Sequence, residues 1–191
     1  KPVVAFISGS GTSGAYLISC AAHKIVALPS AAIGSIGVIS SRPVLERFLE
    51  KIGVHVTVTK SGPLKDMGAF YREPTEEEKQ KEQELINSYL EYFIKVVSKG
   101  RRMEESRVLE LATGEVFLGE KAKATGLVDE VGDFDTALDI AAQLGRVRRR
   151  FTYARPRRGF AERLASRLSI SFVEETIELG YLFIPQIYYL G

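Results

Sequence analysis

The sequence contains one cysteine, two histidines and no tryptophan among 191 residues. A single cysteine, Cys20, excludes an internal disulfide and a zinc site built from cysteines. Its position in an apolar stretch predicts a packing role. No apolar run approaches the roughly 20 residues that span a bilayer, and no signal-peptide pattern is present. The composition, 45% hydrophobic and 26% charged, is typical of a globular domain with a core.

The small net charge of +2 is unevenly distributed. Residues 146–167 hold nine arginines and one acid, whereas residues 73–84 hold six glutamates and two lysines. Both stretches fit a solvated surface. Alternatively, the basic stretch meets anionic lipid headgroups or an acidic neighbouring subunit. Nucleic acid is not expected as a partner, because no base-reading motif accompanies the arginines.

Apolar, β-branched runs alternate with helix-like stretches, which indicates an α/β fold. Thr75 and Glu78 stand in capping-box register at the start of a long helix, and Gly100 is expected to end it. A later helix is capped by either Asp133 or Asp135. The expected strands are 3–7, 24–28, 31–39, 55–59 and 127–131, and the expected helices are 15–23, 43–52, 75–99, 104–112, 119–125 and the capped helix to 144.

The segment Gly9-Ser10-Gly11-Thr12-Ser13-Gly14 joins a predicted strand to a predicted helix. It matches the G-x-G-x-x-G turn of dinucleotide-binding folds, but residues 25–35 contain no acid to bind a ribose. The same residues also fit a nucleophile turn. In such a turn, glycines expose a serine oxygen at a helix N-terminus, and free backbone amides face a developing oxyanion. A purely structural turn remains the alternative.

A serine hydroxyl needs a base to become a nucleophile. His23 lies too far along the helix to serve Ser13, since a rise of 1.5 Å per residue separates the two by roughly 15 Å. His55 is expected to be structural or on the surface. A lysine that burial keeps neutral can replace histidine. Lys65 is the candidate because it follows a predicted strand in a glycine-containing loop, and we expect the neighbouring Asp66 to point away from its amine.

Ordered motifs are found in segments 12–16, 21–27, 33–38, 60–68, 114–122 and 126–132, which together cover roughly residues 1–145. These motifs resemble those of the signal peptide peptidase A (S49) family of serine peptidases. The resemblance implies a ClpP/crotonase-like α/β fold of stacked ββα units. The chain starts with Lys1-Pro2 and an apolar strand, so the first part of that domain is expected upstream. Residues 1–145 would form the peptidase domain, and the basic and aromatic residues 146–191 an arm for packing or oligomerisation.

The resemblance also implies roles for individual residues. Ser13 would be the nucleophile and Lys65 the general base. The Ser35 hydroxyl would hold the lysine amine, and the Gly14 amide would be one oxyanion donor. The second donor would come from a loop before Lys1.

The implied function is that of a serine endopeptidase that degrades cleaved signal peptides and other extended apolar peptides. It would be a homo-oligomer without metal or organic cofactor, anchored to the cell membrane by an upstream helix, with the peptidase domain on the extracytoplasmic side. Two alternatives stay open. One is a crotonase-type acyl-CoA enzyme on the same fold. The other is a non-catalytic membrane scaffold that uses helix 75–99 and the arginine-rich tail as contact surfaces.

Overall fold

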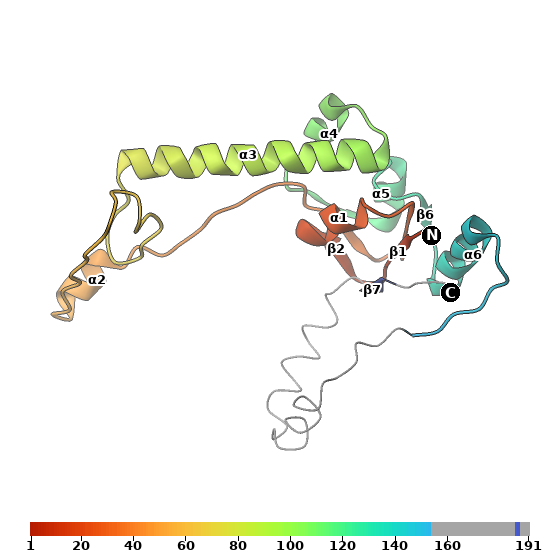
Figure 1. Ribbon diagram of the computed structural model, residues 1–191, viewed down its shortest axis with the longest axis horizontal. Coiled ribbons are helices and arrows are strands. Elements are labelled where there is room, and N and C mark those ends of the chain that lie inside the picture. The colour runs from red at the N-terminus through yellow and green to blue at the C-terminus, as the bar shows by residue number, and fades with distance from the viewer. Residues whose placement is uncertain (154–185, 188–191) are drawn as a thin grey trace, which may run out of the picture. The chain divides into compact units, whose positions relative to one another are not determined.

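The computed structural model describes residues 1–153 and 186–187 and divides the chain into two compact units (Figure 1). Unit 1 comprises residues 1–37 and 93–191, and unit 2 comprises residues 38–92. Most of the predicted arm, 146–191, lies outside the described residues, so its role stays a prediction.

Unit 1 contains two sheets. Their strands are β1 Val4–Ile7, β2 Ser10–Thr12, β3 Lys24–Ala27, β4 Ala32–Gly34, β5 Val116–Leu118, β6 Glu130–Val131 and β7 Gln186–Ile187. In the first sheet, β3 lies between β1 and β6 and pairs with both in parallel, and β7 pairs with β1 in the antiparallel sense. In the second, β4 lies between β2, its parallel neighbour, and β5, its antiparallel neighbour.

Consecutive strand pairs are distributed between these two sheets. β1 and β3 are neighbours in one sheet, and the strands that follow them, β2 and β4, are neighbours in the other. Along the chain, helix α1, Gly14–Ser19, follows β1 and β2, so these three elements form one ββα unit. The α/β class and the stacked ββα units are therefore confirmed. The apolar side chains of β3, Ile25, Val26 and Ala27, are fully buried, as expected of a parallel strand covered on both faces.

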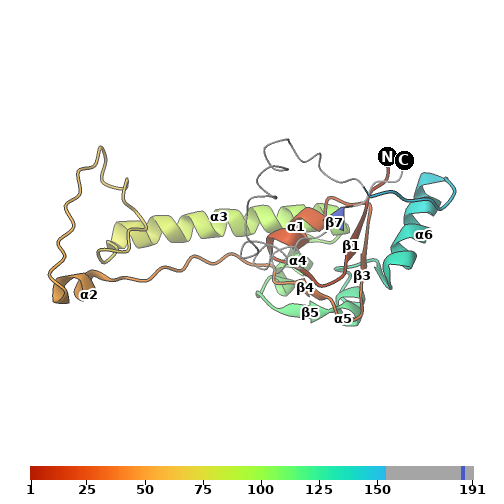
Figure 2. The same ribbon diagram turned by 90° about the horizontal axis from the view of Figure 1, so that it is seen from below.

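Helices pack against both sheets of unit 1. Helix α6, Phe134–Gly145, lies against β1 (Figure 2), where Ala137 packs with Val4 and Val26. Asp133 is its N-cap, because its carboxylate accepts a hydrogen bond of 2.9 Å from the Thr136 amide. The remaining short helices of unit 1 are α4, Glu105–Leu111, and α5, Gly119–Ala124.

Helix α3, Glu76–Arg101, is the long helix predicted from the sequence. The capping box is present: the Thr75 amide donates to Glu78 Oε2 at 2.9 Å, and the Glu78 amide donates to Thr75 Oγ1 at 3.2 Å. The prediction that Gly100 ends the helix was wrong. Helix α3 ends one residue later, at Arg101, and Arg102 has the positive φ, 54°, that is common just after a helix. A Cβ atom on Gly100 would overlap the Cys20 carbonyl oxygen, so a glycine is needed here for the close approach of two backbones.

Other boundaries also differ from the sequence-based expectation. The helix predicted to reach residue 23 ends at Ser19, because the His23 amide donates to the Val3 carbonyl and turns the chain into β3. Of the strand predicted at residues 31–39, only β4, Ala32–Gly34, is formed. Residues 55–59 form no strand in the described structure. The short strands β2 and β5 were not predicted, since three residues show too little alternation.

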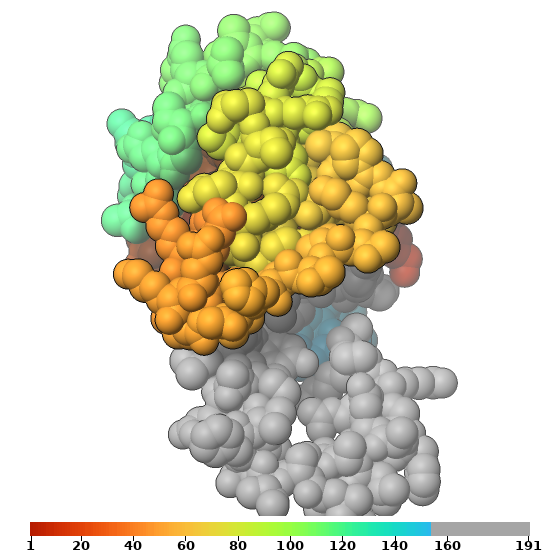
Figure 3. Space-filling view, turned by 90° about the vertical axis from the view of Figure 1, so that its left-hand side faces the viewer, coloured from red at the N-terminus to blue at the C-terminus, as the bar shows by residue number. Residues whose placement is uncertain are grey.

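Unit 2 consists of α2, Glu46–Lys51, a long loop and the first turns of α3. Figure 3 shows it as orange and yellow atoms. None of its apolar side chains is buried, and Glu78, 2% exposed, is its one buried residue. Large apolar side chains such as Phe48 and Tyr92 are 56% and 61% exposed. Polar contacts, not an apolar core, therefore organise this unit.

Candidate active site

Ser13 occupies the turn between β2 and α1. Its backbone has φ 50° and ψ −123°, a conformation that residues with a side chain rarely adopt. The turn is held by the Ser13 amide, which donates to the Gly34 carbonyl at 2.8 Å, and by the Leu17 amide, which donates to the Ser13 carbonyl at 2.9 Å. The Ser13 side chain is exposed and makes no capping hydrogen bond. The hydroxyl is thus presented at the start of a helix, as a nucleophile turn requires.

The glycines of this turn have separate tasks. A Cβ atom on Gly11 would stand 2.5 Å from the Ile7 side chain, so β2 packs this closely on β1 only with glycine. Gly14 has open space where its Cβ would be. It is the first residue of α1, and the first amides of a helix have no partner within the helix. The Gly14 amide is therefore suited to stabilise an oxyanion formed beside Ser13.

The structure brings Ser35 next to this turn. Thr12 and Gly34 are partners in the parallel ladder of β2 and β4, so Ser13 and Ser35 follow directly from paired positions. Ser35 also has a positive φ, 48°, and its amide donates to the Glu115 carbonyl at 2.7 Å. Ser13, Gly14 and Ser35 therefore lie together in unit 1.

Lys65 belongs to unit 2, in a turn where its amide donates to the Gly62 carbonyl at 3.2 Å. Its side chain is exposed. The pairing of Ser13 with Lys65 joins residues of different units and stays a prediction. Asp66 is directed to other partners, as expected: its carboxylate accepts hydrogen bonds from Lys60 at 2.6 Å and from Arg72 at 3.0 Å.

The two histidines and the cysteine have structural surroundings. His23 Nδ1 accepts a hydrogen bond of 3.1 Å from the Val3 amide. His55 is exposed and lines a cavity of about 410 Å³ in unit 2. Cys20 is 4% exposed, and burial raises the pKa of its thiol to about 11. A protonated, buried thiol fits the packing role predicted for it.

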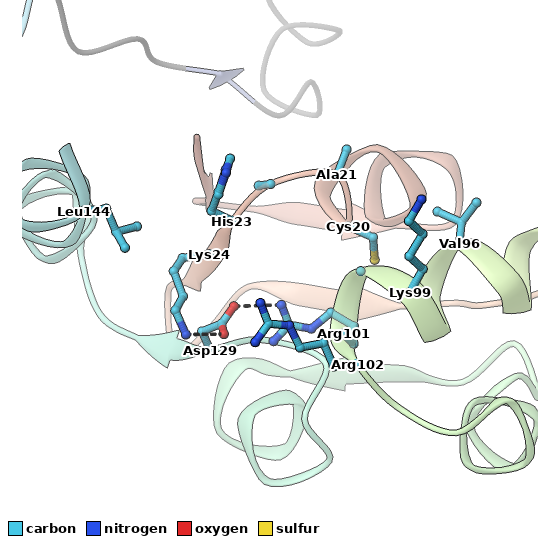
Figure 4. Close-up of a pocket in the computed structure, with 12 residues that line it drawn as sticks. Cys20, Ala21, His23, Lys24, Val96, Lys99, Arg101, Arg102, Asp129 and Leu144 are labelled. Atoms are coloured by element: carbon cyan, nitrogen blue, oxygen red, sulfur yellow. Dashed lines mark hydrogen bonds and ion pairs between the residues drawn. The ribbon is translucent and has the colours of Figure 1, made fainter. Parts of the chain in front are cut away.

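Sequence reasoning missed a polar cluster around Asp129 in unit 1, which Figure 4 shows. The Asp129 carboxylate accepts hydrogen bonds from Lys24 at 2.9 Å, from the Ile25 amide at 2.8 Å and from Arg101 at 2.7 Å. Burial alone would raise the pKa of Asp129, but the hydrogen bonds from Arg101, Ile25 and Lys24 lower it. The cluster lines a cavity of about 680 Å³. Its members come from segments far apart in the sequence, so no local sequence pattern indicates the cluster.

Buried Tyr16 ties α1 to a distant segment of the same unit. Its hydroxyl donates to the Leu127 carbonyl at 2.7 Å, and the side chain is fully buried. Burial and the neighbouring Cys20 raise the pKa of Tyr16 far above its ordinary value. This anchor fixes the helix that starts beside Ser13.

Residues 1–153 contain no group of three or more histidine, cysteine, aspartate or glutamate side chains arranged to hold a metal ion. Within the same part of the chain, no helix combines the length and the apolar character needed to cross a membrane.

An exposed serine on a strand–turn–helix, beside free helix amides and a second hydroxyl, is the arrangement of a serine hydrolase. Comparison with known proteins agrees with this class. The model of peptidase family S49 matches residues 1–148. The chain belongs to this family.

The relatives are consistent with that assignment. A Methanocaldococcus jannaschii protein provisionally named a protease is 40% identical over 147 residues, which are 77% of this chain and 47% of that protein. An Enterococcus faecium protein provisionally named signal peptide peptidase SppA is 41% identical over 138 residues, 72% of this chain and 40% of that protein. The chain thus spans less than half the length of these two curated relatives.

Among solved structures, similarity extends to the 1510-N membrane-bound stomatin-specific protease, a mutant in complex with a substrate peptide. The TM-score is 0.45 and the identity 18%, over 87% of this chain and 69% of that one.

Proposed function

We propose that this protein is a serine endopeptidase in which Ser13 is the nucleophile and Lys65 the general base. The observation that carries the proposal is the exposed, strained Ser13 at the start of α1, with Gly14 and Ser35 beside it. Membership of peptidase family S49 supports it.

The reaction would proceed through an acyl-enzyme. Neutral Lys65 accepts the Ser13 proton while the serine oxygen bonds to the peptide carbonyl carbon. The Gly14 amide donates to the resulting oxyanion. The Lys65 ammonium then protonates the leaving nitrogen as the C–N bond breaks. Water then gives a proton to Lys65 as its oxygen bonds to the ester carbonyl carbon. Lys65 returns that proton to the Ser13 oxygen as the C–O bond breaks, which releases the acid and restores both side chains.

This mechanism needs the Lys65 amine to be uncharged near neutral pH, whereas an unperturbed lysine titrates near 10.4. Lys65 is exposed within unit 2, so the amine would lose water only on meeting the Ser13 turn. Ser35 would then accept a hydrogen bond from the amine and fix its direction. Desolvation favours the uncharged amine, and the Ser35 hydroxyl would orient the amine without adding a negative charge beside it.

The proposed substrates are extended apolar peptides, including signal peptides after their release. A relative named for signal peptide peptidase activity supports this class. Binding by strand addition would give main-chain hydrogen bonds, with pockets for alternate side chains. The proposed location is the cell membrane, with the peptidase domain on the extracytoplasmic side. Fractionation of cells, followed by protease treatment of intact cells, tests that location.

The test of the proposed dyad uses Ser13→Ala and Lys65→Ala in the intact protein. Each is expected to lower cleavage of a fluorogenic apolar peptide by at least about 10³-fold, because nucleophile and base act as a unit. A fluorophosphonate probe should label the native protein at Ser13 and leave Ser13→Ala unlabelled. Labelling would separate the peptidase from the crotonase-type enzyme and the scaffold.

Matched controls are Ser8→Ala, an exposed serine before the same turn, and Lys51→Ala, an exposed lysine at the end of α2. Both should cleave at the native rate. Native activity in Ser13→Ala or Lys65→Ala would exclude the dyad.

We also propose that the protein acts as a homo-oligomer. The uncovered apolar side chains of unit 2 support this, since a surface of that kind is usually buried against a partner.

A further inference from the structure

The residue that follows Lys65 is the centre of a charged network in unit 2. The Asp66 carboxylate accepts hydrogen bonds from Lys60 Nζ at 2.6 Å, Arg72 Nε at 3.0 Å and the Tyr71 hydroxyl at 3.2 Å. Its side chain is only 11% exposed. Lys65 is not among the donors to the Asp66 carboxylate in the part of the chain that the structure describes. A carboxylate adjacent to the proposed base is thus fully engaged elsewhere.

Arg72 connects this carboxylate to the long helix. Its two terminal nitrogens donate to both oxygens of Glu78, at 2.8 and 2.5 Å. Such two-pronged pairs fix the relative orientation of both planar groups. Glu78 Oε2 also accepts the Thr75 amide in the capping box of α3. The loop that carries Lys65 is therefore tied through one arginine to the first turn of the helix.

The two carboxylates of the network are ionised throughout the neutral pH range. Hydrogen bonds from Arg72 and then Lys60 hold the pKa of Asp66 far below its ordinary value. Those from Arg72 and the Thr75 amide lower the pKa of Glu78 to about 2. Because unit 2 buries no apolar side chain, these charged contacts are what orders the loop.

We propose that Asp66, Arg72 and Glu78 are positioning residues for the Lys65 base: they fix its loop on α3 and keep the Asp66 carboxylate from pairing with its amine. The inference rests on the proposed function, since it concerns the base of that dyad. It assigns no contact with substrate to the three residues.

The chemical reason is the effect of a free carboxylate on a neighbouring amine. A carboxylate within hydrogen-bond reach stabilises the ammonium form, which cannot accept the serine proton. Lys60, Tyr71 and Arg72 occupy Asp66, so this competition is suppressed. The cavity next to the network is also lined by two further acids and a histidine, Glu46, Glu50 and His55. Releasing Asp66 from Arg72 would leave one cation, Lys60, to hold it.

The test is the pH profile of kcat/KM for Arg72→Gln in the intact protein. We expect its acidic limb to move to higher pH by about one unit, because the freed Asp66 carboxylate favours the ammonium of Lys65. Adding Asp66→Asn to Arg72→Gln removes that carboxylate and should return the limb to the native position. A loop that is merely less stable would lower the amount of active enzyme and leave the limb in place.

The matched control is Arg42→Gln, which breaks another arginine–glutamate pair of unit 2, in which Arg42 Nη1 donates to both oxygens of Glu82, at 2.8 and 2.9 Å. It should keep the native limb. Rates are normalised to the sites that react with a fluorophosphonate probe, so a partly unfolded variant is still informative. An unmoved limb in Arg72→Gln, or a limb that stays shifted in the double variant, overturns the proposal.

The two proposals fail in different ways. If Lys65→Ala keeps native activity, the dyad itself is wrong. If native activity depends on Ser13 and Lys65 but the Arg72→Gln limb coincides with the native one, only the positioning role is wrong.

Discussion

Two serines with positive φ lie side by side at the ends of β2 and β4, at 50° for Ser13 and 48° for Ser35. Such a conformation costs of order 1–3 kcal/mol per residue and persists only where neighbours impose it. The carbonyls of Gly34 and Glu115 do so here by accepting the two serine amides. Backbone strain at two hydroxyl-bearing residues that lie side by side in space is typical of a functional site.

Asp129 gives a prediction at the same scale. Asp129→Asn should lower the free energy of unfolding at pH 7 by about 2 to 3 kcal/mol, because the nearly buried guanidinium of Arg101, 7% exposed, loses its anionic partner. Denaturant unfolding at pH 7 measures it.

The pH dependence follows from the lowered pKa of Asp129. A carboxylate whose pKa is depressed in the folded state contributes its stability above the unfolded pKa, about 3.9, and loses it as the pH falls through the folded pKa. The difference between native protein and Asp129→Asn should therefore shrink below about pH 4. Glu130→Gln, in an exposed pair with Lys123, should change stability by less than about 1 kcal/mol. An equal loss in both variants would contradict the role given to Asp129.

At the scale of elements, Gly100 is an exception to the helix preference for alanine over glycine. Alanine is preferred to glycine inside a helix by about 1 kcal/mol, yet a Cβ atom here would overlap the Cys20 carbonyl. Gly100→Ala should therefore destabilise the protein, by about 1 to 3 kcal/mol, since α3 must move away from the end of α1. Thermal unfolding measures the shift.

The neighbouring exposed residue supplies the comparison. Lys99→Ala should stay within about 0.5 kcal/mol of the native protein. A stabilised Gly100→Ala variant would mean that the two backbones separate without cost.

The segment around residues 55–59 shows why an element can be predicted and then not form. Val54, Val56 and Val58 alternate with polar residues, as in a half-buried strand. All three are more than 40% exposed, and the described chain offers them no ladder partner. A strand is defined by the neighbour that accepts its hydrogen bonds, and alternation alone does not supply one.

At the scale of the whole molecule, the apolar surface of unit 2 leads to a prediction on assembly. Val56, 47% exposed, is expected to lie in a contact between copies of the chain. Val56→Lys should then lower the mass measured by light scattering after size-exclusion chromatography, because a buried charge opposes association.

Leu109→Lys is the matched control in unit 1, since Leu109 is 58% exposed on α4. It should keep the native mass. A native protein that is monomeric at micromolar concentration would contradict the proposed homo-oligomer.

The amino-acid sequence by itself determined the local features of this protein. Buried β-branched runs specified β1 and β3, Thr75 and Glu78 specified the start of α3, and the turn around Ser13 identified the candidate nucleophile. These depend on interactions within a few residues, which a sequence pattern records. Membership of family S49 was likewise predictable from ordered motifs and is confirmed.

Only the tertiary structure decided what depends on distant partners. The register of β2 with β4 placed Ser35 beside Ser13, and the close approach of the Cys20 backbone made glycine necessary at position 100. The clusters around Asp129 and Asp66 join side chains through geometry that no spacing encodes. Hydrogen bonds and close packing between such residues form only when folding brings them together, so the fold alone could reveal them.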